Sequence, residues 1–148
     1  MDHDSTRPTA ALPDLLRLTA EDGSSGVLLA TRCPDCGATA PGVRRACPNC
    51  TSRAVRTIEC DQSGTLVSHT IVHRAAQSWT GRVPYALGDV ELPQRVIVTA
   101  EIVGASAETL RRGAPMQLRL EVLERTGAAP PLVIHRWTPV RVATGEKP

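Results

Sequence analysis

The sequence contains no Phe, and only Trp79, Tyr85 and Trp137 carry aromatic rings among its 148 residues. The formal net charge is +2, so a strongly basic surface is also absent. Proteins that bind nucleic acid usually neutralise phosphates with such a surface, and those that hold single strands stack bases on aromatic side chains. The composition therefore disfavours nucleic acid as the partner.

Long apolar runs are missing as well. A charged residue interrupts each of them well before the roughly 18 residues that a membrane-spanning helix needs. The start, "MDHDSTRPTAALPDLL", has neither the basic nor the apolar region of a secretory signal. With 41% hydrophobic and 22% charged residues, the chain has the composition of a globular protein. We expect a folded cytoplasmic protein with no membrane partner.

Four of the five cysteines lie in "RCPDCGATAPGVRRACPNC", residues 32–50, as the pairs Cys33/Cys36 and Cys47/Cys50. In a reducing compartment such pairs are more often metal ligands than disulfides. Two Cys-x-x-Cys turns supply four thiolates to one tetrahedral ion, and a full shell leaves no position for substrate. The spacing predicts a structural zinc site, with iron and a redox pair as alternatives.

Zinc and its thiolates would bring the net charge to about zero. The fifth cysteine, Cys60, lies outside this pattern at the end of a strand-like run. We expect a buried apolar thiol there, with a nucleophile that accepts an acyl group as the alternative.

Apolar residues at helical spacing follow Pro13, which predicts a short amphipathic helix over 13–22. From residue 63 onward, five β-rich runs alternate with Gly, Pro or polar breaks. The run "SAETLRR" between the third and the fourth is expected to form one or two helical turns. The predicted fold is all-β with a short N-terminal helix, a rubredoxin-like zinc ribbon and a five-stranded OB-fold barrel. The expected parts are a helical segment (1–25), the ribbon (26–60), the OB-fold (61–142) and a disordered tail (143–148).

Other side chains could contact a ligand or a partner. The arginines around the cysteines, Arg32, Arg44, Arg45, Arg53 and Arg56, either offset the charge of the metal cluster or hold a phosphate or an acidic surface. His69 and His73 are expected on one face of a strand, as surface residues or as a metal or acid–base pair. The loop "AQSWTGRVPYALG" joins the first two barrel strands, where OB-folds commonly bind. The candidate ligand- or partner-binding residues are Arg44, Arg45, Arg53, His73, Arg74, Trp79, Arg82 and Tyr85.

The order of these motifs resembles that of the Zn-ribbon/OB-fold proteins catalogued as domain of unknown function 35. The segments "RCPDCG" and "CPNC" lead into "GTLVSHTIVHRA", "PYALGDVEL", "LRRGAPMQL" and "VIHRWTPV", so the resemblance covers roughly residues 13–142. Family members typically have an aromatic pair before the ribbon, which "PDLLRLTA" lacks, and an aromatic residue near the last strand, a place that Trp137 fills.

The resemblance implies a noncatalytic accessory subunit of a thiolase-like or other acyl-CoA enzyme, in lipid or polyketide metabolism. In such assemblies the partner supplies the catalytic residues, and the barrel helps to enclose the CoA or acyl group. The ribbon or the N-terminal segment holds the partner. Two other hypotheses stay open: a nucleic-acid-binding ribbon and OB module, and an enzyme that acts through Cys60 or the two histidines.

Overall fold

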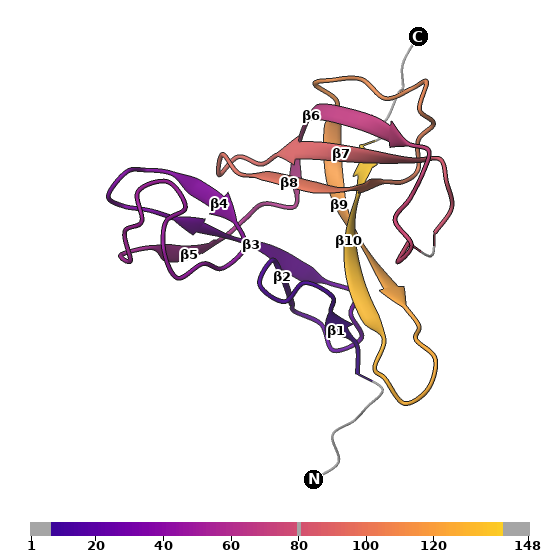
Figure 1. Ribbon diagram of the computed structural model, residues 1–148, viewed down its shortest axis with the longest axis horizontal. Coiled ribbons are helices and arrows are strands. Elements are labelled where there is room, and N and C mark those ends of the chain that lie inside the picture. Colours follow the sequence, from indigo (N-terminus) through magenta and orange to yellow (C-terminus); the bar gives the residue numbers. More distant parts are fainter. Residues whose placement is uncertain (1–6, 80, 141–148) are drawn as a thin grey trace.

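The structure is a computed structural model that describes residues 7–79 and 81–140. Within these ranges every regular element is a strand (Figure 1). The first sheet contains β1 (Thr9–Ala10), β6 (Ser63–Val72), β7 (Tyr85–Glu91), β8 (Ile97–Ile102), β9 (Pro115–Leu123) and β10 (Leu132–Pro139). The second contains β2 (Leu16–Leu18), β3 (Gly26–Arg32), β4 (Thr39–Pro41) and β5 (Arg56–Glu59).

The five long strands close into a barrel. Their order is β6–β7–β8–β10–β9, and β9 pairs again with β6. All contacts between them are antiparallel except the one between β8 and β10, which is parallel. This is the strand order of a Greek-key OB-fold, so the predicted barrel is confirmed, with each of its five strands close to the predicted place.

Alternating burial along β8 shows how the sequence makes a barrel wall. Val98, Ala100 and Ile102 are buried, whereas Ile97 before them and Thr99 between them are exposed. Successive side chains of a strand point to opposite faces, so the three buried residues line the interior. Gly88 lies inside β7, where a Cβ would collide with the side chain of Ile102. Gly88 therefore allows β7 and β8 to curve closely around the core.

Trp137 closes the barrel. It lies on β10 opposite Ile102 of β8 and Leu118 of β9, and it has no exposed surface. Its indole N–H donates to the Val98 carbonyl at 3.0 Å, so burial leaves no unsatisfied donor. The aromatic residue that the family resemblance places near the last strand is thus the centre of the core.

The N-terminal helix predicted over 13–22 is wrong. One turn forms, in which the amides of Leu15 and Leu16 donate to the Leu12 carbonyl, and the chain then extends as β2. Leu16, Arg17 and Leu18 pair with Leu28, Val27 and Gly26 of β3 in an antiparallel ladder. Leu16 is buried, as is Leu28 opposite it. Pairing with β3 buries these leucines better than an isolated short helix would, so tertiary contacts overrode the helical spacing.

Residues 103–114 contain no helix either, although "SAETLRR" predicted one or two turns. A single turn forms, in which the Thr109 amide donates to the Ser106 carbonyl at 3.1 Å. The segment is then fixed to β6, because the Gly113 amide donates to the Leu66 carbonyl and the Leu66 amide to the Ala114 carbonyl. Leu110, which belongs to this segment, is buried in the core, so the segment packs on the barrel without a helix.

The remaining architecture joins the ribbon to the barrel. β3 pairs with both β4 and β5, and one continuous cluster of buried side chains extends from Leu16, Leu28 and Ala30 to Leu66 and Trp137. β1 pairs in parallel with the edge of β10.

The predicted boundaries of the parts stay a prediction, and the predicted tail, residues 143–148, lies outside the described residues. In the described part of the chain, no helix is long and apolar enough to cross a membrane.

Candidate metal centre and neighbouring surfaces

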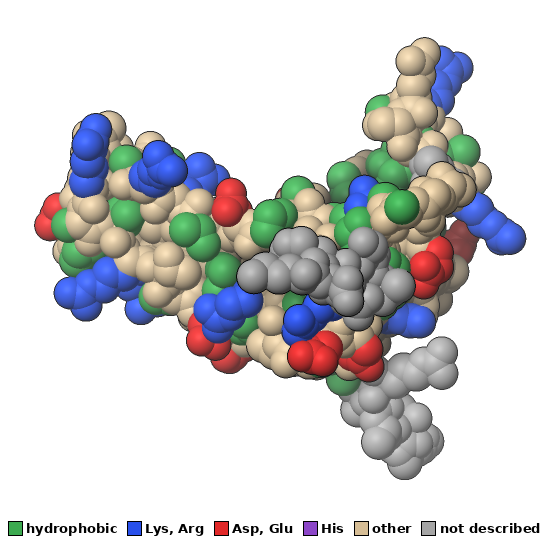
Figure 2. Space-filling view, turned by 90° about the horizontal axis from the view of Figure 1, so that it is seen from below, with side chains coloured by type: hydrophobic (Ala, Val, Ile, Leu, Met, Phe, Trp, Pro, Cys, Tyr) green, Lys and Arg blue, Asp and Glu red, His purple; other side chains and the backbone are tan. Residues whose placement is uncertain are grey.

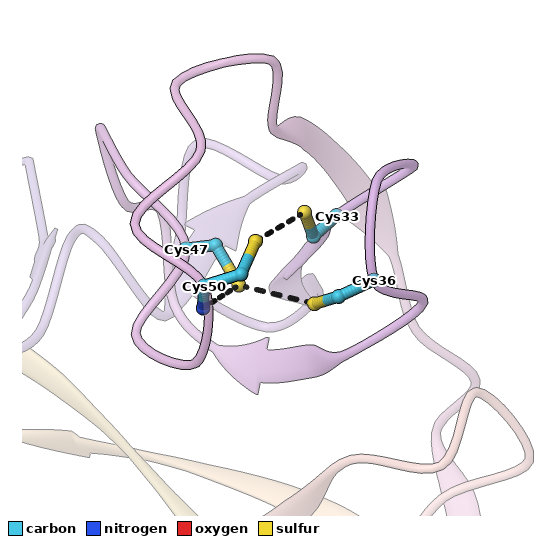
Figure 3. A group of neighbouring side chains, drawn as sticks. All are labelled: Cys33, Cys36, Cys47 and Cys50. Atoms are coloured by element: carbon cyan, nitrogen blue, oxygen red, sulfur yellow. Dashed lines mark hydrogen bonds between the residues drawn. The ribbon is translucent and has the colours of Figure 1, made fainter.

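Cys33 and Cys36 follow the end of β3, and Cys47 and Cys50 lie in the loop between β4 and β5. The four sulfurs converge, with all of them within 4.8 Å of one another (Figure 3). Cys33 Sγ lies 3.5 Å from Cys50 Sγ, and Cys36 Sγ lies 3.6 Å from Cys47 Sγ. The ribbon therefore brings together the cysteines that the spacing predicted as ligands.

The two Cys-Pro-x-Cys turns share one backbone pattern. In the first, the Gly37 amide donates to the Cys33 carbonyl and the Cys33 amide to the Ala38 carbonyl. In the second, the Thr51 amide donates to the Cys47 carbonyl and the Cys47 amide to the Ser52 carbonyl. The residue after each pair has a positive φ, 77° at Gly37 and 65° at Thr51. Each turn points its two sulfurs into the space between the turns.

This space fits a tetrahedral ion. Zinc–sulfur bonds of about 2.3 Å place the sulfurs of a tetrahedron about 3.8 Å apart, close to the measured separations. The amides of Asn49 and Cys50 approach Cys47 Sγ at 3.4 and 3.5 Å, and the Asn49 side-chain amide approaches Cys36 Sγ at 3.5 Å. N–H groups directed at sulfur stabilise thiolates, which are the form that binds metal. Four cysteine donors complete the shell of such an ion.

The pKa values of the two exposed cysteines shift in opposite directions. The hydrogen bond from Asn49 is the main cause that lowers the pKa of Cys36 to about 6. At Cys50 the Ser52 amide favours the thiolate, but the neighbouring sulfurs and burial outweigh it and raise the pKa to about 12. Crowded sulfurs cannot all ionise together without a compensating charge, and a divalent cation supplies that charge.

Burial differs within each pair. Cys33 and Cys47 are only 1% and 3% exposed, whereas Cys36 and Cys50 lie at the surface. The first cysteine of each pair therefore anchors its turn in the fold, and the second reaches the cluster from the solvent side. A set of four sulfurs that face one another has no place for a substrate, which is typical of a structural site.

The ribbon arginines lie on the surface around this cluster. Arg32, Arg44, Arg45, Arg53 and Arg56 are all exposed. Figure 2 shows arginine side chains gathered over the ribbon end of the molecule. Within the described residues, the ion pairs instead involve Arg7, Arg17 and Arg136. The five ribbon arginines thus have no carboxylate partner there, and Arg44 Nε instead donates to the Pro41 carbonyl at 3.4 Å.

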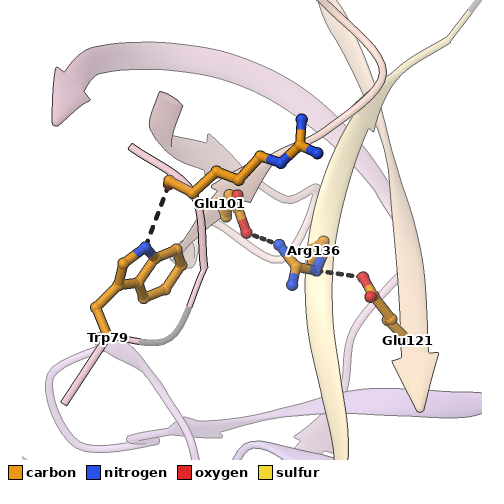
Figure 4. A network of polar contacts seen from close by, with 5 residues as sticks. Trp79, Glu101, Glu121 and Arg136 are labelled. Atoms are coloured by element: carbon orange, nitrogen blue, oxygen red, sulfur yellow. Dashed lines mark hydrogen bonds and ion pairs between the residues drawn. The ribbon is translucent and has the colours of Figure 1, made fainter. Parts of the chain in front are cut away.

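The loop between β6 and β7 brings three candidate residues together. The rings of Trp79 and Tyr85 stack at a centroid distance of 4.3 Å, with 20° between their planes. The Trp79 indole N–H donates to the Arg82 carbonyl at 3.2 Å (Figure 4). Arg82 and Tyr85 also line a hollow of about 390 Å³ at one end of the barrel, beside Ile102 and Glu108. This is the loop that the sequence predicted as a binding surface.

The two histidines lie in different elements, although the sequence predicted both on one face of a strand. His69 lies on β6 opposite Gly88, whereas β6 ends at Val72 and leaves His73 beyond the strand. His73 and the adjacent Arg74 are exposed.

Cys60 is buried, and burial raises the pKa of its thiol, which opposes nucleophilic reactivity.

A buried ion cluster escaped the sequence analysis. Arg136 of β10 lies between Glu101 of β8 and Glu121 of β9 and forms an ion pair with each (Figure 4). The side chains of Arg136 and Glu101 are only 14% and 19% exposed, so these two charges compensate each other in a poorly hydrated place, whereas Glu121 is 44% exposed. The signal in the sequence was weak, because Glu101 lies far from Arg136 in the sequence and meets it only through the parallel contact of β8 with β10, whereas Glu121 meets it through the antiparallel pairing of β9 with β10.

Comparison with known proteins identifies the barrel. Residues 58–121 match the family described as the C-terminal OB-fold domain of ChsH2. Over these residues the barrel is similar to the ChsH2-type OB-fold domain. The resemblance to domain of unknown function 35 is thereby confirmed. A search of curated proteins finds no match to the chain.

Two solved structures resemble this chain. The Ltp2–ChsH2 (DUF35) aldolase is 24% identical, with 76% of this chain and 84% of that chain covered and a TM-score of 0.56. A DUF35 protein of unknown function from Sulfolobus solfataricus is 16% identical, with 73% and 76% covered and a TM-score of 0.42. The first of these structures shows that the two chains share a fold.

Proposed function

We propose that this chain is a noncatalytic accessory subunit of a thiolase-like or other acyl-CoA enzyme. It binds that enzyme in a hetero-oligomer in the cytoplasm, stabilises the complex and helps to enclose the CoA or acyl group. The partner supplies the catalytic residues. The observation that carries the proposal is the ChsH2-type barrel, because the similar solved structure is an aldolase named for two components, Ltp2 and ChsH2.

The metal cluster supports this role. We propose that Cys33, Cys36, Cys47 and Cys50 hold one structural Zn²⁺, since four thiolates in tetrahedral spacing favour zinc. Zinc supplies folding free energy to a ribbon whose outer half has few buried apolar side chains. The cluster then acts as a rigid support for the exposed surface around it.

The hollow beside Arg82 and Tyr85 is the proposed contact with the CoA moiety. It has the volume of a small-ligand site, and Arg82 offers a guanidinium to a phosphate. We expect Arg82→Ala to weaken binding of CoA by the complex about tenfold, as loss of a charged hydrogen bond does. Arg119→Ala, an exposed arginine on β9, is the matched control.

Co-expression tests the main proposal. The chain is produced alone and with thiolase-like enzymes of the same organism, and size-exclusion chromatography with light scattering measures complex formation. We expect a stable complex that turns over acyl-CoA, and no turnover by the chain alone. Strong turnover by the isolated chain, or no association with the enzyme, would contradict the proposal.

A nucleic-acid-binding module is the second candidate, favoured by the five exposed arginines of the ribbon next to an OB barrel. It predicts a salt-dependent mobility shift of labelled single-stranded DNA or RNA. We expect no such shift at physiological salt, because Trp79 and Tyr85 already stack on each other and the net charge is low.

A further inference from the structure

An exposed groove lies where the N-terminal segment meets the ribbon, away from the sulfur cluster and from the hollow at the barrel end. Leu12, Pro13, Asp14 and Leu15 form one wall, and Pro41, Gly42, Val43 and Arg44 form the other. Its volume is about 410 Å³. Neither the ChsH2-type barrel match, residues 58–121, nor the metal site includes these residues.

The groove is unusually apolar for an exposed place. Leu12 is 54% exposed and Val43 is 41% exposed, two of the six large hydrophobic side chains exposed in the described part of the chain. Contiguous exposed apolar surface on a folded protein commonly marks an interaction site, whereas a single exposed side chain does not. Here two such side chains share one depression.

Both walls are fixed before any partner binds. The Val43 amide donates to the Asp14 carbonyl at 2.8 Å, which ties one wall to the other. Thr31, the buried polar residue of β3, donates from its hydroxyl to the Gly42 carbonyl at 2.7 Å and accepts from the Arg44 amide at 3.0 Å. A preformed groove loses little conformational entropy on binding, which favours affinity.

The charge around the groove selects the occupant. Arg44 lies at its rim and Arg45 follows, and among residues 7–79 and 81–140 no carboxylate lies within ion-pair distance of either guanidinium. Asp14 on the opposite wall disfavours a second carboxylate there. An apolar side chain with a carboxylate on one side of it complements this arrangement, because interfaces combine an apolar centre with a charged rim.

We propose that this groove is the docking site for the partner enzyme, through an apolar side chain of its surface flanked by an acidic residue. The inference rests on the proposed function, because the partner is the acyl-CoA enzyme. Leu12 and Val43 receive the apolar side chain, and Arg44 and Arg45 attract the carboxylate.

The test measures the dissociation constant between the full chain and a thiolase-like enzyme of the same organism, by surface plasmon resonance. Leu12→Ser and Val43→Ser are each expected to weaken binding about tenfold, as truncation of a buried interface anchor does. Leu12→Met and Val43→Ile, which keep the apolar surface, should bind within about twofold of the wild type. Circular dichroism checks that every variant is folded.

Arg44→Glu should slow association and remove much of its dependence on salt concentration. The matched controls are Ile97→Ser, an exposed apolar residue of β8, and Arg119→Glu, an exposed arginine of β9. We expect both controls to bind like the wild type.

These measurements distinguish failure of the proposed function from failure of the proposed docking groove. Absence of binding by the wild-type chain overturns the proposed function and the groove with it. Groove variants that bind as tightly as the wild type, or controls that weaken binding as much as the groove variants do, overturn the groove alone. If Leu12→Ser instead converts a dimer of this chain to a monomer without changing affinity for the enzyme, a second copy occupies the groove and the proposal is wrong.

Discussion

Strand β3 and the loop that follows it lie in two environments, and the difference shows how the barrel and the ribbon are each held together. Leu28 and Ala30 of β3 belong to the apolar core that continues into the barrel around Trp137. Beyond Arg32, the chain enters the sulfur cluster, where Cys33 and Cys47 are the buried anchors. The barrel is stabilised by apolar burial, and the outer ribbon by the ion that its sulfurs fit.

Removal of the metal is expected to cause the largest difference in stability between the ribbon and the barrel. Cys47→Ser deletes a buried ligand and so forfeits most of a binding free energy that is about 10–16 kcal/mol in zinc-finger peptides. Metal analysis should find about one zinc per wild-type chain and almost none in the variant. Hydrogen exchange should then show loss of protection in residues 33–55, while β6–β10 stay protected.

Cys60→Ala is the matched control for this change, because Cys60 is buried but lies outside the cluster. It should keep a full equivalent of zinc. Collapse of the barrel together with the ribbon in Cys47→Ser would show that the two regions are one cooperative unit.

Trp137→Ala is the corresponding change in the barrel. Trp137 is fully buried, and its removal creates a cavity and leaves the Val98 carbonyl without its donor. We expect a loss of about 3–5 kcal/mol in the free energy of unfolding, measured by urea denaturation. Trp79→Ala, which removes a partly exposed ring, should cost far less. Equal losses in the two variants would contradict a barrel centred on Trp137.

Acid is expected to destabilise the barrel through His135. Burial lowers the pKa of its imidazole below the ordinary value of 6.5, against a smaller opposite effect of the Thr99 carbonyl. Below that value the unfolded chain binds the proton more readily than the folded chain, so stability falls as pH falls through 6.5 toward the folded pKa. His135→Gln should lose less stability than the wild type between pH 7.5 and pH 5 in urea denaturation.

His73→Gln, which changes an exposed imidazole, is the matched control variant. The comparison of the two variants matters because protonation of the cysteines also releases metal in acid. If His135→Gln and the wild type lose equal stability over this range, the barrel imidazole does not contribute.

The barrel and the cluster could be predicted because their signals are local. Apolar and polar residues alternate along "VIVTAEI" and "MQLRLEV", and each Cys-x-x-Cys pair forms its own turn. The N-terminal helix failed because the leucines at 12, 15 and 16 fit a helix locally, and only β3, which follows in the chain, offers Leu16 a better partner.

Features that depend on distant segments could not be predicted. The Glu101–Arg136–Glu121 cluster and the groove at Leu12 and Val43 each require segments that the fold brings together. No spacing rule joins residue 12 to residue 43 or residue 101 to residue 136. Both features follow from the way in which the strands pair, whereas the sequence predicted only the class of fold.

The smallest expected effect distinguishes the two cysteine turns from each other. Thr51 has a φ of 65°, a left-handed conformation that is strained for a β-branched residue, whereas its counterpart Gly37 adopts a φ of 77° without strain. Thr51→Gly should therefore stabilise the ribbon by about 1 kcal/mol, even though the hydroxyl bond to the Cys50 carbonyl is lost. Competition with a zinc chelator should show about fivefold tighter metal binding.

Gly37→Thr is the reciprocal change. A Cβ at Gly37 would meet no atom within 4 Å, so any loss there reports the backbone conformation alone. We expect a loss of similar size, about 1 kcal/mol, in the same competition. If Thr51→Gly weakens metal binding while Gly37→Thr also weakens it, the Thr51 hydroxyl contributes more than the strain costs, and the two turns are stabilised in different ways.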